Sequence, residues 1–136
     1  MKKIVIDTNL WISFLIGKRL QAMEMLFRHE DVSIYMCEEL IDEILEVANR
    51  PKLAKHIKSQ DIELLEKIIK TYCIFVEIKK KSSLPIRDPK DLYLLSLCES
   101  IPAEYILSGD EDLLSVDTQG KYQIMTFMDF FKLIFN

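Results

Sequence analysis

The sequence predicts an α/β fold in which helices cover both faces of a mostly parallel sheet, a three-layer α/β/α sandwich. Short apolar runs rich in β-branched residues alternate along the chain with segments whose apolar residues recur at helical spacing. Such alternation favours parallel strands joined by helical crossovers. The 136 residues are 49% hydrophobic, which is enough for one core, so we expect a single domain spanning 1–136.

The chain opens with a strand and two helices. The apolar run 4–6 is too short and too β-branched for a helix, whereas 10–16 and 21–29 have helical character and are separated by a break at 17–19. A second strand is expected at 31–36.

Two amphipathic helices and a strand follow. Apolar residues recur at helical spacing over 38–49, and Pro51 marks the end of that helix. Ser59 is expected to be the N-cap of the next helix, which runs to about residue 72. The third strand is expected at 73–78.

The second half begins with the most loop-like segment, 79–87. Asp88 as N-cap and Pro89 as the first helical residue predict a helix that runs to about residue 99 and is largely buried. The remaining elements are expected as a strand at 105–107, a helical turn near 113, a strand at 122–125 and a helix at 127–135.

Two aspartates follow apolar strands. Asp7 ends the first strand, where it is either a site residue or the cap of the next helix; Thr8 and Asn9 could serve as caps and leave Asp7 free. The strand 105–107 likewise leads through small polar residues to Asp110. Two parallel strands would place Asp7 and Asp110 at the same edge of the sheet.

Asp91 shares a helical face with Leu95 and Cys98, which points its carboxylate inward. The alternative is an acid in the first helical turn, stabilised there by the helix dipole.

On the helix 38–49, periodicity places Asp42 and Glu46 on the surface, opposite the apolar stripe. Glu43 and Glu38 lie at the two margins of the stripe, and periodicity does not choose between them.

Several carboxylates without a His or Cys cluster predict a site for a hard divalent cation, Mg²⁺ or Mn²⁺. His29 and His56 lie far from these motifs, and Cys37, Cys73 and Cys98 have no paired spacing, so we expect reduced core cysteines.

The net charge of −4 excludes the global basic field of a non-specific nucleic-acid binder, so a polyanionic substrate would need local basic patches. Candidates are Lys52 with Lys55 and Lys58, and 79–81 with Arg87; solvated surface is the alternative. Without a signal-peptide core or a run of membrane-spanning length, we expect a cytoplasmic protein that does not contact membranes.

Four motifs in this order make the chain resemble the PIN domain family, and within it the bacterial toxin-like branch related to VapC ribonucleases. The motifs are IVIDTN at 4–9, LIDEIL at 40–45 followed by RPK at 50–52, RDPKD at 87–91, and SGDEDLL at 108–114. The resemblance covers nearly the whole chain and favours Glu43 over Glu38.

The resemblance implies a PIN-like fold and an Mg²⁺- or Mn²⁺-dependent endoribonuclease. Asp7 and Asp91 would hold the principal metal, and Glu43 and Asp110 would complete the site partly through waters, so that an activated water attacks the phosphodiester. Ser108 stands where the family often has threonine, and Leu92 where it often has a polar residue. The other implied roles are Asn9 orienting Asp7, Ser108 as a supporting hydroxyl, Asp112 as an accessory acid, and Lys52 and Arg87 in substrate binding.

The resemblance also implies partners: an RNA substrate, a homodimer and a small antitoxin protein of a type II toxin-antitoxin system. Large apolar side chains in the first two helices could form a groove for a partner helix or, alternatively, pack in the core. They are Trp11, Phe14, Leu15, Met23, Met25, Leu26 and Phe27.

Two rival functions remain open at this point. A haloacid-dehalogenase-like phosphatase also places an aspartate after its first strand but needs a second acid two residues later, where this chain has Asn9. A non-catalytic interaction module could bind metal through the same acids for structure alone.

Overall fold

The computed structural model describes residues 2–17, 20–84 and 91–135. Its strands are β1 (Lys2–Ile6), β2 (Val32–Met36), β3 (Ile74–Phe75), β4 (Tyr105–Leu107) and β5 (Gln123–Met125). Its helices are α1 (Thr8–Ile16), α2 (Leu20–Phe27), α3 (Glu38–Ala48), the 3-10 turn η1 (Pro51–Leu53), α4 (Ser59–Tyr72), α5 (Leu92–Ser100), α6 (Glu111–Leu114) and α7 (Phe127–Phe135).

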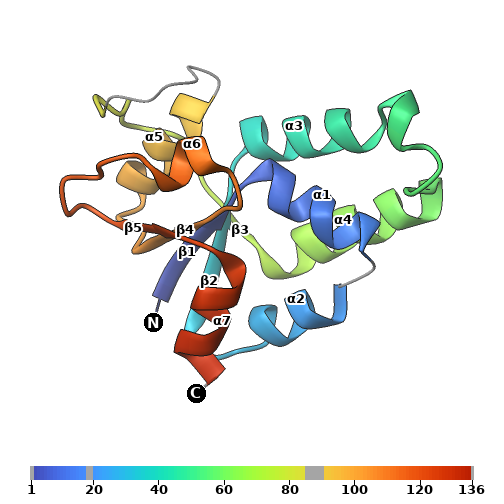
Figure 1. Ribbon diagram of the computed structural model, residues 1–136, viewed down its shortest axis with the longest axis horizontal. Coiled ribbons are helices and arrows are strands. Elements are labelled where there is room, and N and C mark those ends of the chain that lie inside the picture. Colours follow the sequence, from blue (N-terminus) through green and yellow to red (C-terminus); the bar gives the residue numbers. More distant parts are fainter. Residues whose placement is uncertain (1, 18–19, 85–90, 136) are drawn as a thin grey trace.

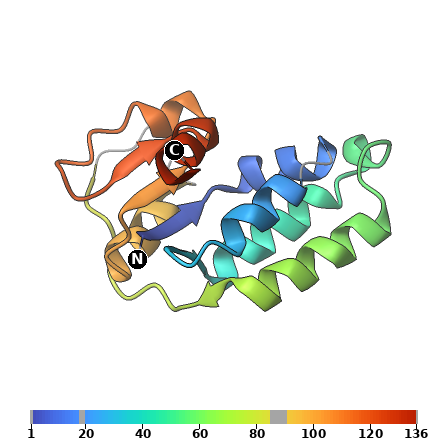
Figure 2. The same cartoon turned by 90° about the horizontal axis from the view of Figure 1, so that it is seen from below.

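The strands form one sheet in the order β3-β2-β1-β4-β5, and each of the four pairings is parallel. Figure 2 shows α5 and α7 on opposite sides of β1 and β4, while α1 to α4 lie together on one side of the molecule (Figure 1). The predicted α/β class and parallel sheet are therefore confirmed.

The strand order places a topological switch beside β1. From β1 the chain adds β2 and then β3 on one side, and it then crosses to add β4 and β5 on the other. In open α/β sheets, ligands bind outside the carboxyl ends of the strands at such a switch point. The residues that follow β1 and β4 occupy that position.

A tryptophan holds the corner between β1 and α1. The Trp11 indole Nε1–H donates to the carbonyl of Ile6 over 3.1 Å, and its ring stacks on Phe27. Trp11 is fully buried, so this hydrogen bond is shielded from water. The indole thereby fixes the carbonyl directly before Asp7.

Most of the large side chains considered for a partner groove are core residues. Trp11, Phe14, Leu15, Met23 and Leu26 are buried, whereas Met25 is 53% exposed. The three cysteines are free and buried, as expected.

The predicted boundaries of α4 and β3 differ from the structure. The helix 59–72 begins as predicted, but its N-cap is Lys58 and not Ser59, because the Asp61 carboxylate accepts the Lys58 backbone N–H over 2.9 Å. The strand 73–78 reduces to β3; the Val76 backbone N–H still donates to the Met36 carbonyl over 2.9 Å, and the Lys79 and Lys80 backbone N–H groups donate to the Ser100 hydroxyl on α5. Asp88, predicted as N-cap, and Pro89, predicted as the first helical residue, lie outside the described residues.

Candidate active site at the carboxyl ends of the strands

The strands β1 and β4 bring their acidic C-terminal extensions together. Ile6 pairs with Leu107, and the backbone N–H of Asp7 continues the ladder by donating to the Leu107 carbonyl over 3.1 Å. The predicted common edge for Asp7 and Asp110 is confirmed by this register.

Asp7 uses both carboxylate oxygens. Oδ1 accepts the Leu10 backbone N–H over 2.8 Å, which makes Asp7 the N-cap of α1, and Oδ2 accepts the Ser108 hydroxyl. The expectation that Thr8 and Asn9 would cap the helix in its place is wrong, because α1 begins at Thr8 and Asp7 is the extended residue before it. Cap and site candidate are thus the same side chain.

Asp7 is a buried acid in a negative environment. Only 2% of the residue is exposed, and burial is the main cause that raises the pKa of its carboxyl. The charges of Asp110 and Glu43 raise this pKa further, whereas the hydrogen bonds from Ser108 and Leu10 oppose the rise. The two hydrogen bonds therefore offset only part of the cost of burying the Asp7 negative charge. A cation at this edge would offset more of it.

Ser108 connects the two strand ends. It is fully buried, donates its hydroxyl to Asp7 and accepts the Asp110 backbone N–H over 2.9 Å. Asp110 is half-buried and caps α6, with Oδ1 accepting the Asp112 backbone N–H over 2.9 Å. The hydroxyl of Ser108 thus sets the position of one acid relative to the other.

Glu43 reaches the edge from α3. It is half-buried, whereas Glu38, Asp42 and Glu46 are exposed, as periodicity predicted for the last two. The Glu43 carboxylate accepts the phenol O–H of Tyr93 on α5. Burial and the hydrogen bond to Glu43 raise the pKa of that phenol far above its usual value.

Asp91 stands at the start of α5. It is half-buried, makes no side-chain cap of its own helix, and precedes Leu95 and Cys98, which are fully buried. Its backbone is in the αR conformation, and the alternative of a first-turn acid behind an Asp88 cap falls on residues 88–90, outside the described part of the chain.

The acidic side chains of the described residues do not form a complete metal-binding site in the conformation observed. Within 2–17, 20–84 and 91–135, no group of three or more His, Cys, Asp or Glu side chains is arranged to hold a metal ion. Asp7 gives both oxygens to protein donors, and like charges without a cation repel one another. The donor set itself, carboxylates and one hydroxyl, suits Mg²⁺ or Mn²⁺.

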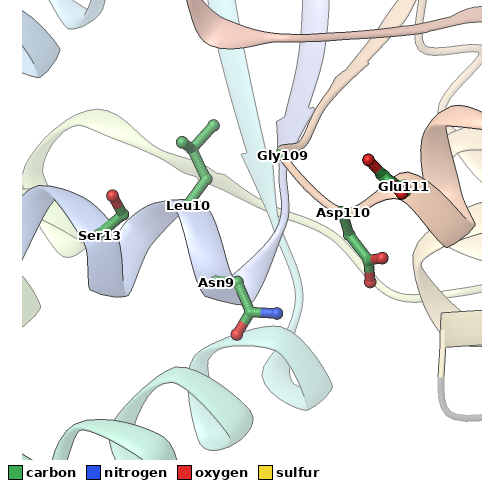
Figure 3. A pocket seen from close by; sticks show the side chains of 6 residues that line it. All are labelled: Asn9, Leu10, Ser13, Gly109, Asp110 and Glu111. Atoms are coloured by element: carbon green, nitrogen blue, oxygen red, sulfur yellow. The ribbon is translucent and has the colours of Figure 1, made fainter.

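A cavity of about 500 Å³ opens beside Asp110. It is lined by Asn9, Leu10, Ser13, Gly109, Asp110 and Glu111. Asn9 and Asp110 approach it from α1 and from the residue before α6, with their polar ends turned to the same side (Figure 3). A Cβ added at Gly109 would meet no atom within 4 Å, so this wall of the cavity is open.

The structure places Asn9 and Lys52 and does not describe Arg87. Asn9 is exposed and faces the cavity, while the hydrogen bonds of the Asp7 carboxylate come from Leu10 and Ser108, so Asn9 does not orient Asp7. Lys52 is exposed on η1. Arg87 lies outside the described residues.

Sequence reasoning missed Tyr93. The available signal was a single phenol in the apolar first turn of this helix, two residues after Asp91. Its partner Glu43 is 50 positions away in the chain, so no local pattern could pair them.

A parallel sheet with acidic strand ends at its switch point defines the class of protein: an α/β protein with a carboxylate-lined open edge. A family model described as PIN domain matches residues 3–112, so this chain belongs to the PIN domain family. Proteins of this family are generally nucleases. Neither this match nor the structure favours the phosphatase alternative.

One protein is similar to this chain in sequence, and one solved structure is similar in fold. The chain is 28% identical over 124 residues to an uncharacterized protein of Methanocaldococcus jannaschii, covering 88% of this chain and 78% of that protein. The fold of the present chain resembles that of a chain in a solved structure, the "Crystal structure of VapBC2 from Rickettsia felis bound to a DNA fragment from their promoter". That match has a TM-score of 0.62 at 12% identity and covers 92% of this chain and 98% of the other, so it shows a shared fold.

The helices in the described part of the chain are too short or too polar to cross a membrane.

Proposed function

We propose that this PIN domain protein is an Mg²⁺- or Mn²⁺-dependent endoribonuclease that hydrolyses phosphodiester bonds. One observation carries the proposal: Asp7 is buried at the switch point of the sheet, and the charges of Asp110 and Glu43 act on it. Carboxylates are kept in such a costly arrangement where a cation offsets their charge. The open cavity beside Asp110 offers space for a substrate.

The proposed ligands are Asp7, Asp91, Asp110 and Glu43, with Asp7 and Asp91 as principal ligands. When bound, Mg²⁺ or Mn²⁺ would activate water and stabilise negative charge on the scissile phosphate. Ser108 holds Asp7 in place through its hydroxyl, and Asp112 supports Asp110 through its backbone N–H. Asn9, exposed at the cavity, is positioned to contact substrate, and Lys52 and Arg87 are proposed to attract the RNA backbone.

Cleavage of labelled single-stranded and structured RNA, with Mn²⁺ or Mg²⁺ against EDTA, tests this proposal. Asp7→Asn and Glu43→Gln should each lower the cleavage rate at least about 100-fold, because each removes an acid of the cation site. Asp42→Asn is the matched control, since Asp42 is the exposed neighbour of Glu43 on α3. It should cleave like the wild type.

The wild type and the three variants are purified in the same way. Cleavage by a contaminating ribonuclease would then appear equally in all four preparations. Metal-dependent cleavage retained by Asp7→Asn would remove the basis of the proposal. Tight Mn²⁺ binding with no cleavage of any RNA would favour the non-catalytic interaction module.

We further propose that the protein is the toxin of a type II toxin-antitoxin pair, works as a homodimer in the cytoplasm and is held inactive by a small antitoxin. The fold shared with a chain of VapBC2 supports this role. Expression of the wild type in bacteria should then arrest growth, and expression of Asp7→Asn should not. Equal growth of the two strains at equal protein levels would contradict the toxin role.

A further inference from the structure

Tyr93 joins three elements around the acidic edge. Its phenol O–H on α5 donates to Glu43 Oε2 on α3. The phenol oxygen of Tyr93 also lies 3.5 Å from the Thr8 hydroxyl at the start of α1. Thr8 is 4% exposed and Tyr93 is half-buried, so water competes weakly for these contacts. One phenol thereby connects the residue after Asp7, the acid of α3 and the first turn that follows Asp91.

A glutamate on a helix margin is otherwise poorly fixed. Its side chain has three rotatable bonds, and ordering it costs conformational entropy whenever a ligand binds. A phenol is protonated at neutral pH and can only donate to a carboxylate with its single O–H. The hydrogen bond to Oε2 therefore restrains Glu43, while the lone pairs of Oε1 can coordinate a cation or accept a hydrogen bond from a water.

We propose that Tyr93 is a positioning residue that holds the Glu43 carboxylate ready for the divalent cation. The inference rests on the proposed function, because it assigns Tyr93 a role toward the same cation. Partners that orient a ligating carboxylate commonly set metal affinity as well as geometry. A purely structural Tyr93 would tie α5 to α3 and leave the affinity for metal unchanged.

The test compares Tyr93→Phe with the wild type by calorimetric titration of Mn²⁺ into the protein. The variant keeps the ring and loses only the O–H, so the metal-free melting temperature should stay close to that of the wild type. The dissociation constant for Mn²⁺ should rise about 10-fold. In Glu43→Gln, the added Tyr93→Phe change should have no further effect, because its partner carboxylate is gone.

Tyr122→Phe is the matched control. Tyr122 also donates its O–H to a glutamate, Glu99, over 3.4 Å, and both residues line a cavity whose lining includes none of the four proposed ligands. It should bind Mn²⁺ and cleave RNA like the wild type.

The outcomes separate the two claims. Unchanged Mn²⁺ affinity in Tyr93→Phe, or an equal loss with and without the Glu43 carboxylate, overturns the role of Tyr93 while the wild type still binds and cleaves. A wild type that neither binds Mn²⁺ nor cleaves RNA overturns the proposed function, and the role of Tyr93 with it.

Discussion

Asp7 shows how one residue can serve the fold and a site together. Its Oδ1 caps α1, which stabilises the helix, while the buried negative charge opposes folding. Ser108 offsets part of that cost by donating to Oδ2. An uncharged side chain could accept the same backbone hydrogen bond and cap α1 equally well. The negative charge of Asp7 would therefore serve to bind a cation.

This balance predicts that Asp7→Asn stabilises the metal-free protein near neutral pH. The pKa of Asp7 is raised in the folded state. At a pH between the unfolded and the folded pKa values, the folded protein therefore holds a proton that the unfolded chain has already released. The stability contributed by that proton is complete below the usual pKa of 3.8 and is lost as the pH rises through the raised value. Thermal unfolding in EDTA should show Asp7→Asn melting above the wild type near neutral pH, with the difference shrinking in acid.

Asp42→Asn provides the comparison, because Asp42 is exposed. Its melting curves should follow those of the wild type across the same pH range. A difference between Asp7→Asn and the wild type that grows as the pH falls would show that the sign is wrong.

At the residue scale, the sequence reveals the acids but not their partners. Asp7 and Asp110 are visible because each follows an apolar strand, and both could be assigned to one edge before the structure. The bonds from Ser108 to Asp7 and from Tyr93 to Glu43 span 101 and 50 positions. Such contacts depend on strand order and helix packing, which local patterns do not contain.

At the scale of elements, periodicity and caps place most helices and strands to within a few residues. The helix 38–49 was predictable because its apolar stripe is continuous, and α3 spans Glu38–Ala48. The strand 73–78 was overestimated, because β-propensity does not reveal where the pairing with β2 ends; the chain then leads to Lys79 and Lys80, whose backbone N–H groups donate to Ser100. The N-cap of α4 was placed one residue too late, at Ser59 instead of Lys58, because the Asp61 side chain accepts the Lys58 backbone N–H from inside the helix.

The order of the strands is the element-scale feature that the sequence left open. Alternation of strand and helix predicts a parallel sheet, but several orders satisfy it. In the observed order β1 lies between β2 and β4, so the chain reverses its direction of addition there. This reversal puts Asp7 at the switch point and brings α3 and α5, with Glu43 and Tyr93, to the same edge.

At the scale of the whole molecule, the acidic edge is assembled from distant parts of the chain. Contacts among Thr8, Tyr93 and Glu43 and between Asp7 and Ser108 join β1, α1, α3, α5 and the end of β4. Bringing such remote segments together costs loop-closure entropy, so the edge forms only as the whole sheet forms. A ligand that bridges these elements should therefore stabilise the fold as a unit.

Mn²⁺ should accordingly raise the melting temperature of the whole protein in one cooperative transition. A ligand at 100 times its dissociation constant adds about 2.7 kcal/mol to the stability of the state that binds it. At this chain length that corresponds to a rise of roughly 10 °C, measurable by circular dichroism. NaCl of equal ionic strength should not reproduce the rise, because screening alone does not bridge the acids. Glu43→Gln should lose most of the rise and Asp42→Asn should keep it; equal shifts in the two variants would mean that Mn²⁺ binds elsewhere on the acidic surface.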